Sequence, residues 1–244
     1  MSDVRQRQPM FNLPGVIVAY AGVLIAFHAI RSLLTLRQDM EVLWLFAFIP
    51  ARYEMVIDQA DLGPKIWTFV TYSFLHGDVV HLLVNLLWLA AFGPAVAWRF
   101  GPVRFVLFSI ATAAGGAAMH LLTHRGEAVA MIGASGVISG LMAGAIRFAF
   151  RRGAPLGVGG RSDPSAFRRP AMSLAESFSD PRVLLFIGVW MVINLAFGIG
   201  SMNIAGESGS IAWQAHVGGF LVGLLLFGFL DPIPAGDPEE PHYL

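Results

Sequence analysis

The stretch MIGASGVISG, residues 131–140, places one hydroxyl, that of Ser135, among Gly133, Ala134 and Gly136 at the start of a strongly apolar run. Small residues of this kind let two membrane helices approach closely, so helix packing is one interpretation. The other interpretation is that Ser135 is a nucleophile. A nucleophilic serine needs a base and hydrogen-bond donors for a developing negative charge, and these must come largely from elsewhere in the chain.

The composition on both sides of this run is typical of an integral membrane protein. Of the 244 residues, 56% are hydrophobic and 13% are charged, whereas about a quarter of the residues of a soluble domain are charged. The 16 basic and 16 acidic residues balance, so no global field favours a nucleic-acid partner. The chain has no cysteine, which excludes disulfides, thiolate catalysis and cysteine-ligated metals.

Six apolar stretches are each close to the roughly 20 residues that a helix needs to cross a bilayer. Strands with open edges would leave backbone groups unsatisfied in lipid, and the alternating pattern of a membrane barrel is absent. We therefore predict an all-α, polytopic membrane protein. Its six transmembrane helices are expected at residues 15–36, 79–98, 102–122, 135–150, 183–200 and 212–230.

The arginines predict the orientation of these helices. If the N-terminus is cytoplasmic, Arg99 and the arginine-rich segment 151–182 are cytoplasmic as well, which the positive-inside rule favours. Both termini are therefore expected inside. We expect a cytoplasmic segment at 1–14, one membrane domain at 15–230, and an acidic, proline-rich and disordered tail at 231–244.

In this topology the second, fourth and sixth helices all run inward, and each carries polar residues near its outer end: His81 with Asn85, Ser135, and His216. Polar groups at membrane depth are costly to bury, so they are candidates for function. Ser135 precedes Arg151 by about 16 residues, or ~24 Å of helix. Against a hydrocarbon core of ~30 Å, this places the hydroxyl several ångströms below the outer surface, where hydrolysis would require a water-filled recess.

His216 is the best candidate for a base among the seven histidines. Histidine is the usual proton acceptor near neutral pH, and the segment AWQAHVGGFLVG places His216 about one turn inside the sixth helix. Gly219 and Gly223 form a small-residue face there, which would let another helix approach and bring Ser135 within hydrogen-bonding reach. The fourth helix carries a matching row of three glycines: Gly136, Gly140 and Gly144.

Donors for a negatively charged oxygen are available at the same depth. Ser135 is expected to open a helix, so its backbone N–H and that of its neighbour Ala134 would be free at the positive end of the helix dipole. His81 and Asn85 are four residues apart and share one helical face. They would add a ring N–H and an amide N–H to the same site.

Three motifs resemble one known family. HGDVVHLLVN at 76–85, GASG at 133–136 and AHVGGFLVG at 215–223 occur in this order on the second, fourth and sixth predicted helices. Together they are similar to the rhomboid intramembrane serine proteases, and the resemblance covers residues 15–230. It implies a six-helix core whose substrates are transmembrane segments of single-span membrane proteins.

The resemblance also implies roles for the site residues. Ser135 would be the nucleophile and His216 the general base of a dyad with no acidic third member. His81, Asn85 and the backbone at Ser135 would form the oxyanion site, and His76 would be structural. No cofactor and no metal are expected, and the multi-pass protein would act in a lipid bilayer, the bacterial inner membrane.

Other classes of protein were weighed against this interpretation. A catalytically silent rhomboid-like protein that binds transmembrane helices is the alternative, although the presence of both dyad residues argues against it. A zinc site using His120 and His124 with His81 or His216 lacks a fitting carboxylate or cysteine. A small transporter would be expected to show an inverted repeat and broken helices near the midplane, and the sequence shows neither.

Overall fold

The computed structural model describes residues 13–54, 62–151, 154, 164–199 and 212–234. Over these residues the regular secondary structure is helical, apart from one isolated β-bridge between Phe48 and Met131, and the helices are joined by turns and loops. Four of the described helices are long and apolar enough to cross a membrane. The predicted class, an integral membrane protein built from helices, is therefore confirmed.

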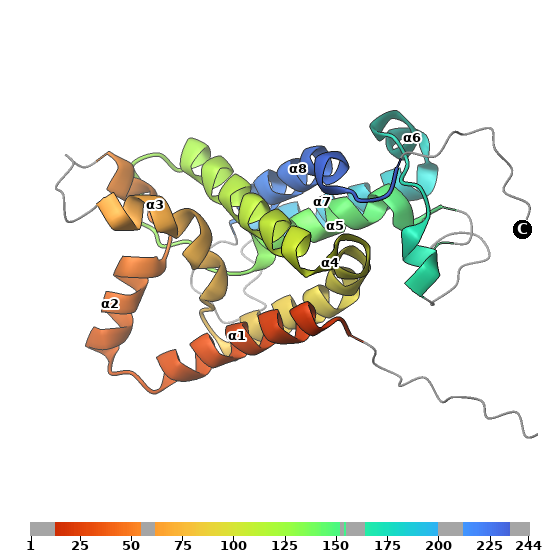
Figure 1. Cartoon of the computed structure of the whole chain (residues 1–244). Helices are drawn as coiled ribbons and strands as arrows, with labels where there is room; N and C mark the ends of the chain where they lie inside the picture. Colours follow the sequence, from red (N-terminus) through yellow and green to blue (C-terminus); the bar gives the residue numbers. More distant parts are fainter. Residues whose placement is uncertain (1–12, 55–61, 152–153, 155–163, 200–211, 235–244) are drawn as a thin grey trace, which may run out of the picture.

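Figure 1 shows α2 and α3 at one end of the molecule and the short α6 at the other. The elements in chain order are α1 (Gly15–Ser32), α2 (Leu36–Phe46), η1 (Pro50–Tyr53), α3 (Leu62–Thr71), η3 (Tyr72–Phe74), α4 (Val79–Thr123), α5 (Ser135–Ala149), η4 (Pro164–Arg168), α6 (Leu174–Ser179), α7 (Pro181–Ile199) and α8 (Trp213–Leu230).

The first helix is shorter than the predicted segment 15–36. It ends at Ser32 because Thr35 starts a new helix, α2, by a capping box. The Thr35 hydroxyl accepts a hydrogen bond from the backbone N–H of Gln38, and the Gln38 side chain accepts one from the backbone N–H of Thr35. Reciprocal capping of this kind satisfies two backbone donors at a helix start.

The second and third predicted helices are the two halves of α4, which has 45 residues. The break lies at Gly101, whose φ of 72° and ψ of 171° are not helical. A positive φ is readily adopted only by glycine, and Pro102, which follows, has no N–H to continue the hydrogen-bond ladder. The predicted gap between 98 and 102 therefore coincides with a sharp change of direction.

Helix α5 is the centre of the molecule. Its 15 residues span ~22 Å, and every residue from Gly136 to Ala149 is buried. It packs against α8 and α4. The contact with α8 is backbone to backbone, because a Cβ on Gly223 would lie 2.5 Å from the carbonyl oxygen of Gly140.

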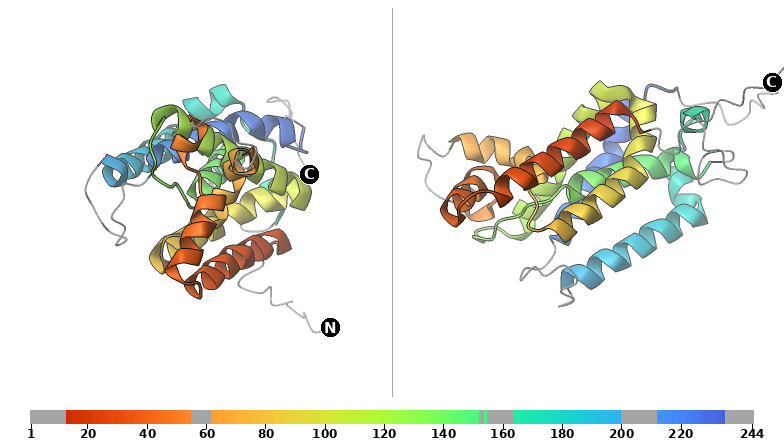
Figure 2. Two further views of the ribbon diagram at one scale, coloured as in Figure 1. Left: turned by 90° about the vertical axis from the view of Figure 1, so that its left-hand side faces the viewer. Right: turned by 90° about the horizontal axis from the view of Figure 1, so that it is seen from below.

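Helices α1 and α7 both lie on the outside of this centre, on different sides of it, as Figure 2 shows. Helix α1 packs on α4. Helix α7 meets α8 through the stacked rings of Trp190 and Phe220, whose centroids are 4.6 Å apart. It exposes several large apolar side chains, as expected for a surface that faces lipid: Leu184, Leu185, Val189, Val192 and Ile193.

A buried ion pair joins the halves of the chain at the α6 end. The Arg99 guanidinium donates to both carboxylate oxygens of Asp231, at 2.9 and 2.7 Å. It also donates to the backbone oxygens of Phe167 and Arg169, at 2.9 and 2.7 Å. Buried charges of this kind need full pairing, so Arg99 links α4, the end of η4 with the residue that follows it, and the end of α8.

Candidate active site

The structure brings together two polar residues that lie 81 positions apart. The Oγ of Ser135 and the Nε2 of His216 are 2.7 Å apart. Ser135 is the first residue of α5, and His216 lies in the first turn of α8. Both residues are partly exposed, so neither is sealed inside the bundle. This distance is normal for a strong hydrogen bond between a hydroxyl and an imidazole nitrogen.

The close approach of α5 and α8 depends on glycine. A Cβ on Gly219 would overlap the carbonyl oxygen of Gly136 and lie 2.8 Å from its carbonyl carbon. One turn further along, Gly223 meets Gly140 in the same way. Because backbone atoms cannot rotate aside, any side chain at these positions would separate the helices that carry Ser135 and His216.

His81 lies against the loop that leads into Ser135. Gly133 has φ of 124°, and its N–H donates to the backbone oxygen of Tyr72 at 3.0 Å. A Cβ on Gly133 would lie 2.8 Å from Nε2 of His81 and 3.7 Å from Oγ of Ser135. Glycine is required here twice, for the positive φ and for the space that the His81 ring occupies.

The first turn of α5 leaves backbone N–H groups without a partner inside the helix. Ala134 is the buried N-cap residue, and the first intrahelical bond at this end runs from the N–H of Ile138 to the oxygen of Ala134. The N–H groups of the first turn, including that of Ser135, therefore have no partner within the helix. These N–H groups lie at the N-terminal end of α5, which is the positive end of its dipole.

Asn85 lies one turn beyond His81 on the same face of α4. It is 3% exposed, and its Nδ2 donates to the backbone oxygen of His81 at 2.9 Å. An amide nitrogen carries two N–H groups, so this bond fixes the amide and leaves a second donor. Asn85 is thus buried beside His81, and the hydrogen bond that its side chain makes is to the helix backbone.

His76 is buried before the start of α4, at 1% exposure. Its ring meets the His81 ring edge to face, with centroids 5.1 Å apart, and its backbone oxygen accepts from Arg31 at 2.8 Å. Burial lowers the pKa of His76 to about 3, and the neighbouring His81 and His28 add to the shift. A neutral His76 ring that packs against His81 is consistent with the structural role expected for this residue.

Asn194 belongs to the site, and our sequence reasoning missed it. It lies on α7 at 6% exposure, and its Oδ1 is hydrogen-bonded to Nδ1 of His216. The signal was available, because an asparagine inside the apolar run 183–200 is a polar group at membrane depth. The sequence alone did not show which helix the amide faces.

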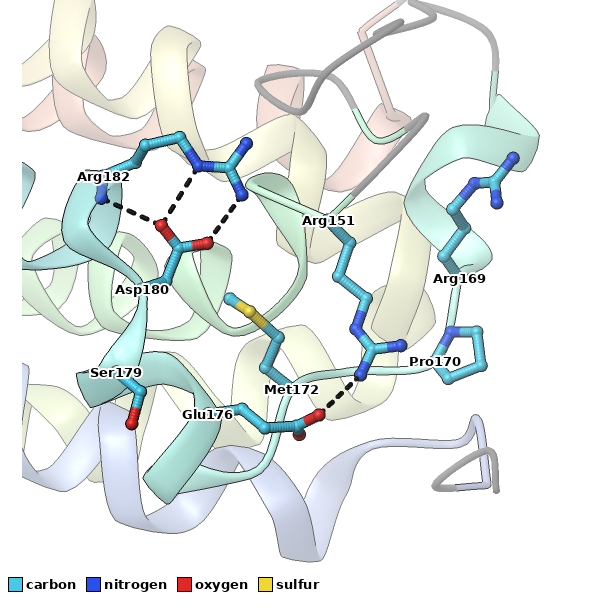
Figure 3. A pocket seen from close by; sticks show the side chains of 8 residues that line it. All are labelled: Arg151, Arg169, Pro170, Met172, Glu176, Ser179, Asp180 and Arg182. Atoms are coloured by element: carbon cyan, nitrogen blue, oxygen red, sulfur yellow. Dashed lines mark hydrogen bonds and ion pairs between the residues drawn. The ribbon is translucent and has the colours of Figure 1, made fainter. Parts of the chain in front are cut away.

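The arginine-rich end of the molecule carries a separate cavity of about 550 Å³ (Figure 3). In it Arg151 pairs with Glu176 at 3.3 Å, and Arg182 pairs with Asp180 at 2.6 Å. Arg151 follows the end of α5 and Ser135 begins it, so the ~22 Å length of α5 separates this cavity from the serine. Its lining residues are Arg151, Arg169, Pro170, Met172, Glu176, Ser179, Asp180 and Arg182.

Within the described part of the chain, no group of three or more His, Asp or Glu side chains could hold a metal ion.

Comparisons with known proteins agree on one family. A family model described as the Rhomboid domain matches residues 63–231. RHOMBOID-like protein 4 of Arabidopsis thaliana is 26% identical over 181 residues, which are 74% of this chain and 36% of that protein. RHOMBOID-like protein 1 of the same plant is 31% identical, over 68% of this chain and 34% of that protein. The Rhomboid protease GlpG of Enterobacter sp. (strain 638) is 27% identical, over 70% of this chain and 50% of that protein. The chain spans between a third and a half of the length of these relatives.

Proposed function

This chain belongs to the rhomboid family, and we propose that it is an intramembrane serine endopeptidase that cleaves transmembrane segments of single-span membrane proteins. The observation that carries the proposal is the 2.7 Å hydrogen bond between Ser135 Oγ and His216 Nε2. A serine hydroxyl becomes an effective nucleophile when a neighbouring base removes its proton. The partial exposure of both residues supports access for water and substrate.

The proposed reaction has two halves. Ser135 Oγ attacks the carbonyl carbon of the scissile amide while its proton passes to His216 Nε2. The tetrahedral intermediate then collapses, the C–N bond breaks, and the amine leaves with that proton. A water molecule next gives its proton to His216 and attacks the acyl-enzyme, which releases the carboxylic acid and restores the Ser135 hydroxyl. Helical amides are hydrogen-bonded and hidden, so the substrate must unwind locally.

The oxyanion of both tetrahedral intermediates would be stabilised at the start of α5. The backbone N–H groups at Ser135 and Ala134 supply one set of donors, and the side chains of His81 and Asn85 supply the other. Donors fixed before the reaction need no reorganisation as charge develops. The hydrogen bond from Asn85 to the His81 backbone, at 2.9 Å, supports such fixation.

Asn85→Ala is therefore expected to lower kcat by about 100- to 1,000-fold, because one side-chain donor is lost. The effect should fall on kcat rather than KM, since the charge exists only in the transition state. Cleavage of a labelled single-span substrate by the purified variant measures both. A variant as active as the wild type would remove Asn85 from the oxyanion site.

We further propose that the membrane domain, residues 15–230, crosses the bilayer six times with both ends in the cytoplasm of a bacterial cell. Four described helices are long and apolar enough to span. The 45-residue α4 would cross twice, because it is broken at Gly101. The buried α5 adds a sixth crossing that is shielded from lipid by its neighbours.

The absence of native cysteine gives a direct test of this orientation. Arg125→Cys, at an exposed position after α4, should react with a membrane-impermeant maleimide added outside intact cells. Ser179→Cys, at the end of α6, should react only after the membrane is permeabilised. The reverse pattern of labelling would contradict the proposed topology.

The proposed activity is tested by two measurements on the purified full-length protein in detergent. A serine-reactive fluorophosphonate probe should label the wild type at Ser135, located by mass spectrometry, and a labelled single-span substrate should be cut once or a few times near its membrane segment. A folded protein that takes no probe and cuts no substrate would support the silent helix-binding alternative.

A further inference from the structure

We propose that Asn194 is a positioning residue, which holds the imidazole of His216 in the tautomer and orientation that make it a base toward Ser135. The inference rests on the proposed function and deepens it, because it extends the pair of residues to a hydrogen-bonded chain of three. The chain runs from α7 through α8 to α5.

The orientation of the Asn194 amide is fixed by its own helix. Its Nδ2 donates to the backbone oxygen of Trp190, one turn earlier on α7, at 2.7 Å. With the nitrogen engaged there, the amide oxygen is the atom that faces His216. Because a carbonyl oxygen has no proton to give, the proton in this bond must be carried by Nδ1 of His216.

This arrangement determines the state of the other ring nitrogen. In a neutral imidazole only one nitrogen carries a proton, so Nε2 has the free lone pair. That lone pair faces the Ser135 hydroxyl at 2.7 Å, in the place where a general base must be. The hydrogen bond at one ring nitrogen therefore sets the function of the other.

Without Asn194 the imidazole of His216 would lose its preference for the tautomer with the proton on Nδ1. The tautomer with the proton on Nε2 could then donate to Ser135 Oγ, and in that state His216 cannot accept the serine proton. During the reaction His216 becomes an imidazolium, and its Nδ1 proton stays hydrogen-bonded to the Asn194 oxygen. The dipole of this buried amide carbonyl stabilises the positive charge of the ring. Both effects act on the chemical step.

A packing role alone would have different consequences. Helix α7 is also held to α8 by the stacked rings of Trp190 and Phe220, with centroids 4.6 Å apart. The contact between the helices therefore does not depend on Asn194 only. If Asn194 only held α7 against α8, its loss would lower the stability of the protein and leave His216 able to accept the proton of Ser135.

The test uses two substitutions of nearly equal size in the full-length protein. Asn194→Leu removes the acceptor, whereas Asn194→Asp keeps an oxygen where Oδ1 lies. Asn194→Leu is expected to lower kcat by about 100-fold, a typical share for general base catalysis, with KM unchanged. Labelling by the fluorophosphonate probe should slow in parallel, because it also needs an activated Ser135. Asn194→Asp should restore most of both rates.

The control is Val192→Ala, a change at an exposed position of the same helix, which should behave as the wild type. Wild-type kcat in Asn194→Leu would overturn the inference, and so would an Asn194→Asp variant no more active than Asn194→Leu. Neither result would touch the proposed function, since the wild type would still cleave. Failure of the wild type to take the probe or cleave substrate would instead overturn the proposed function, and this inference with it.

Discussion

Ser135→Ala is expected to lower the rate of substrate cleavage by a factor on the order of 10⁴ or more, to the background of the assay. The hydroxyl is the proposed nucleophile, and alanine leaves no atom that can form the acyl-enzyme. Labelling by the fluorophosphonate probe should disappear together with cleavage. The fold should persist, because Ser135 is partly exposed and its removal breaks a single side-chain hydrogen bond.

His216→Ala is expected to cost about as much, and the double variant little more than either single one, because the two residues act as one unit. A matched control is Ser109→Ala, which removes a serine hydroxyl bonded to its own helix backbone at 2.8 Å. Its cleavage rate should equal that of the wild type. Substantial activity in Ser135→Ala, with the unfolding temperature unchanged, would refute the assignment of the nucleophile.

Gly219→Ala is the second change for which we expect a large effect, and it adds one methyl group. That carbon would overlap the carbonyl oxygen of Gly136, so α8 must move away from α5. Overpacking a tight core typically costs about 1–3 kcal/mol. The displacement also pulls His216 from Ser135, and a misplacement of about 1 Å can cost about 100-fold in rate. Stability and activity should therefore fall together.

The control lies on the same helix. A Cβ on Gly228 would meet no atom within 4 Å, so Gly228→Ala should leave the cleavage rate unchanged and raise stability slightly through better helix propensity. Thermal unfolding in detergent and the cleavage assay measure both variants. Equal behaviour of Gly219→Ala and Gly228→Ala would show that the α5–α8 contact does not need glycine.

The helical class and the approximate positions of the membrane segments could be predicted from the sequence. The ends of the runs 183–200 and 212–230 lie within two residues of the ends of α7 and α8. Segment length and apolar content suffice for this, because lipid leaves the backbone few alternatives to a helix. The predicted end of the first helix, residue 36, was less accurate, because α1 ends at Ser32 and the capping box at Thr35 starts a new helix.

The chemistry of the candidate site was only partly visible in the sequence. The short motifs and the depth of Ser135 and His216 indicated a pair, because serine and histidine are conspicuous in apolar runs. The same reasoning overlooked Asn194, and it assigned no partner to Arg99. Both residues make their contacts across the bundle, Asn194 to His216 and Arg99 to Asp231.

By itself, then, the sequence determined that this chain lies in a membrane, approximately where its long apolar helices lie, and which hydroxyl and imidazole are candidates for chemistry. Only the tertiary structure decided that Ser135 and His216 meet at 2.7 Å, and that Asn194 faces the far side of the same ring. The physical reason is that a sequence fixes the depth of a side chain along its helix. The rotation of that helix about its axis is set by packing, here by glycines that bring two backbones into contact.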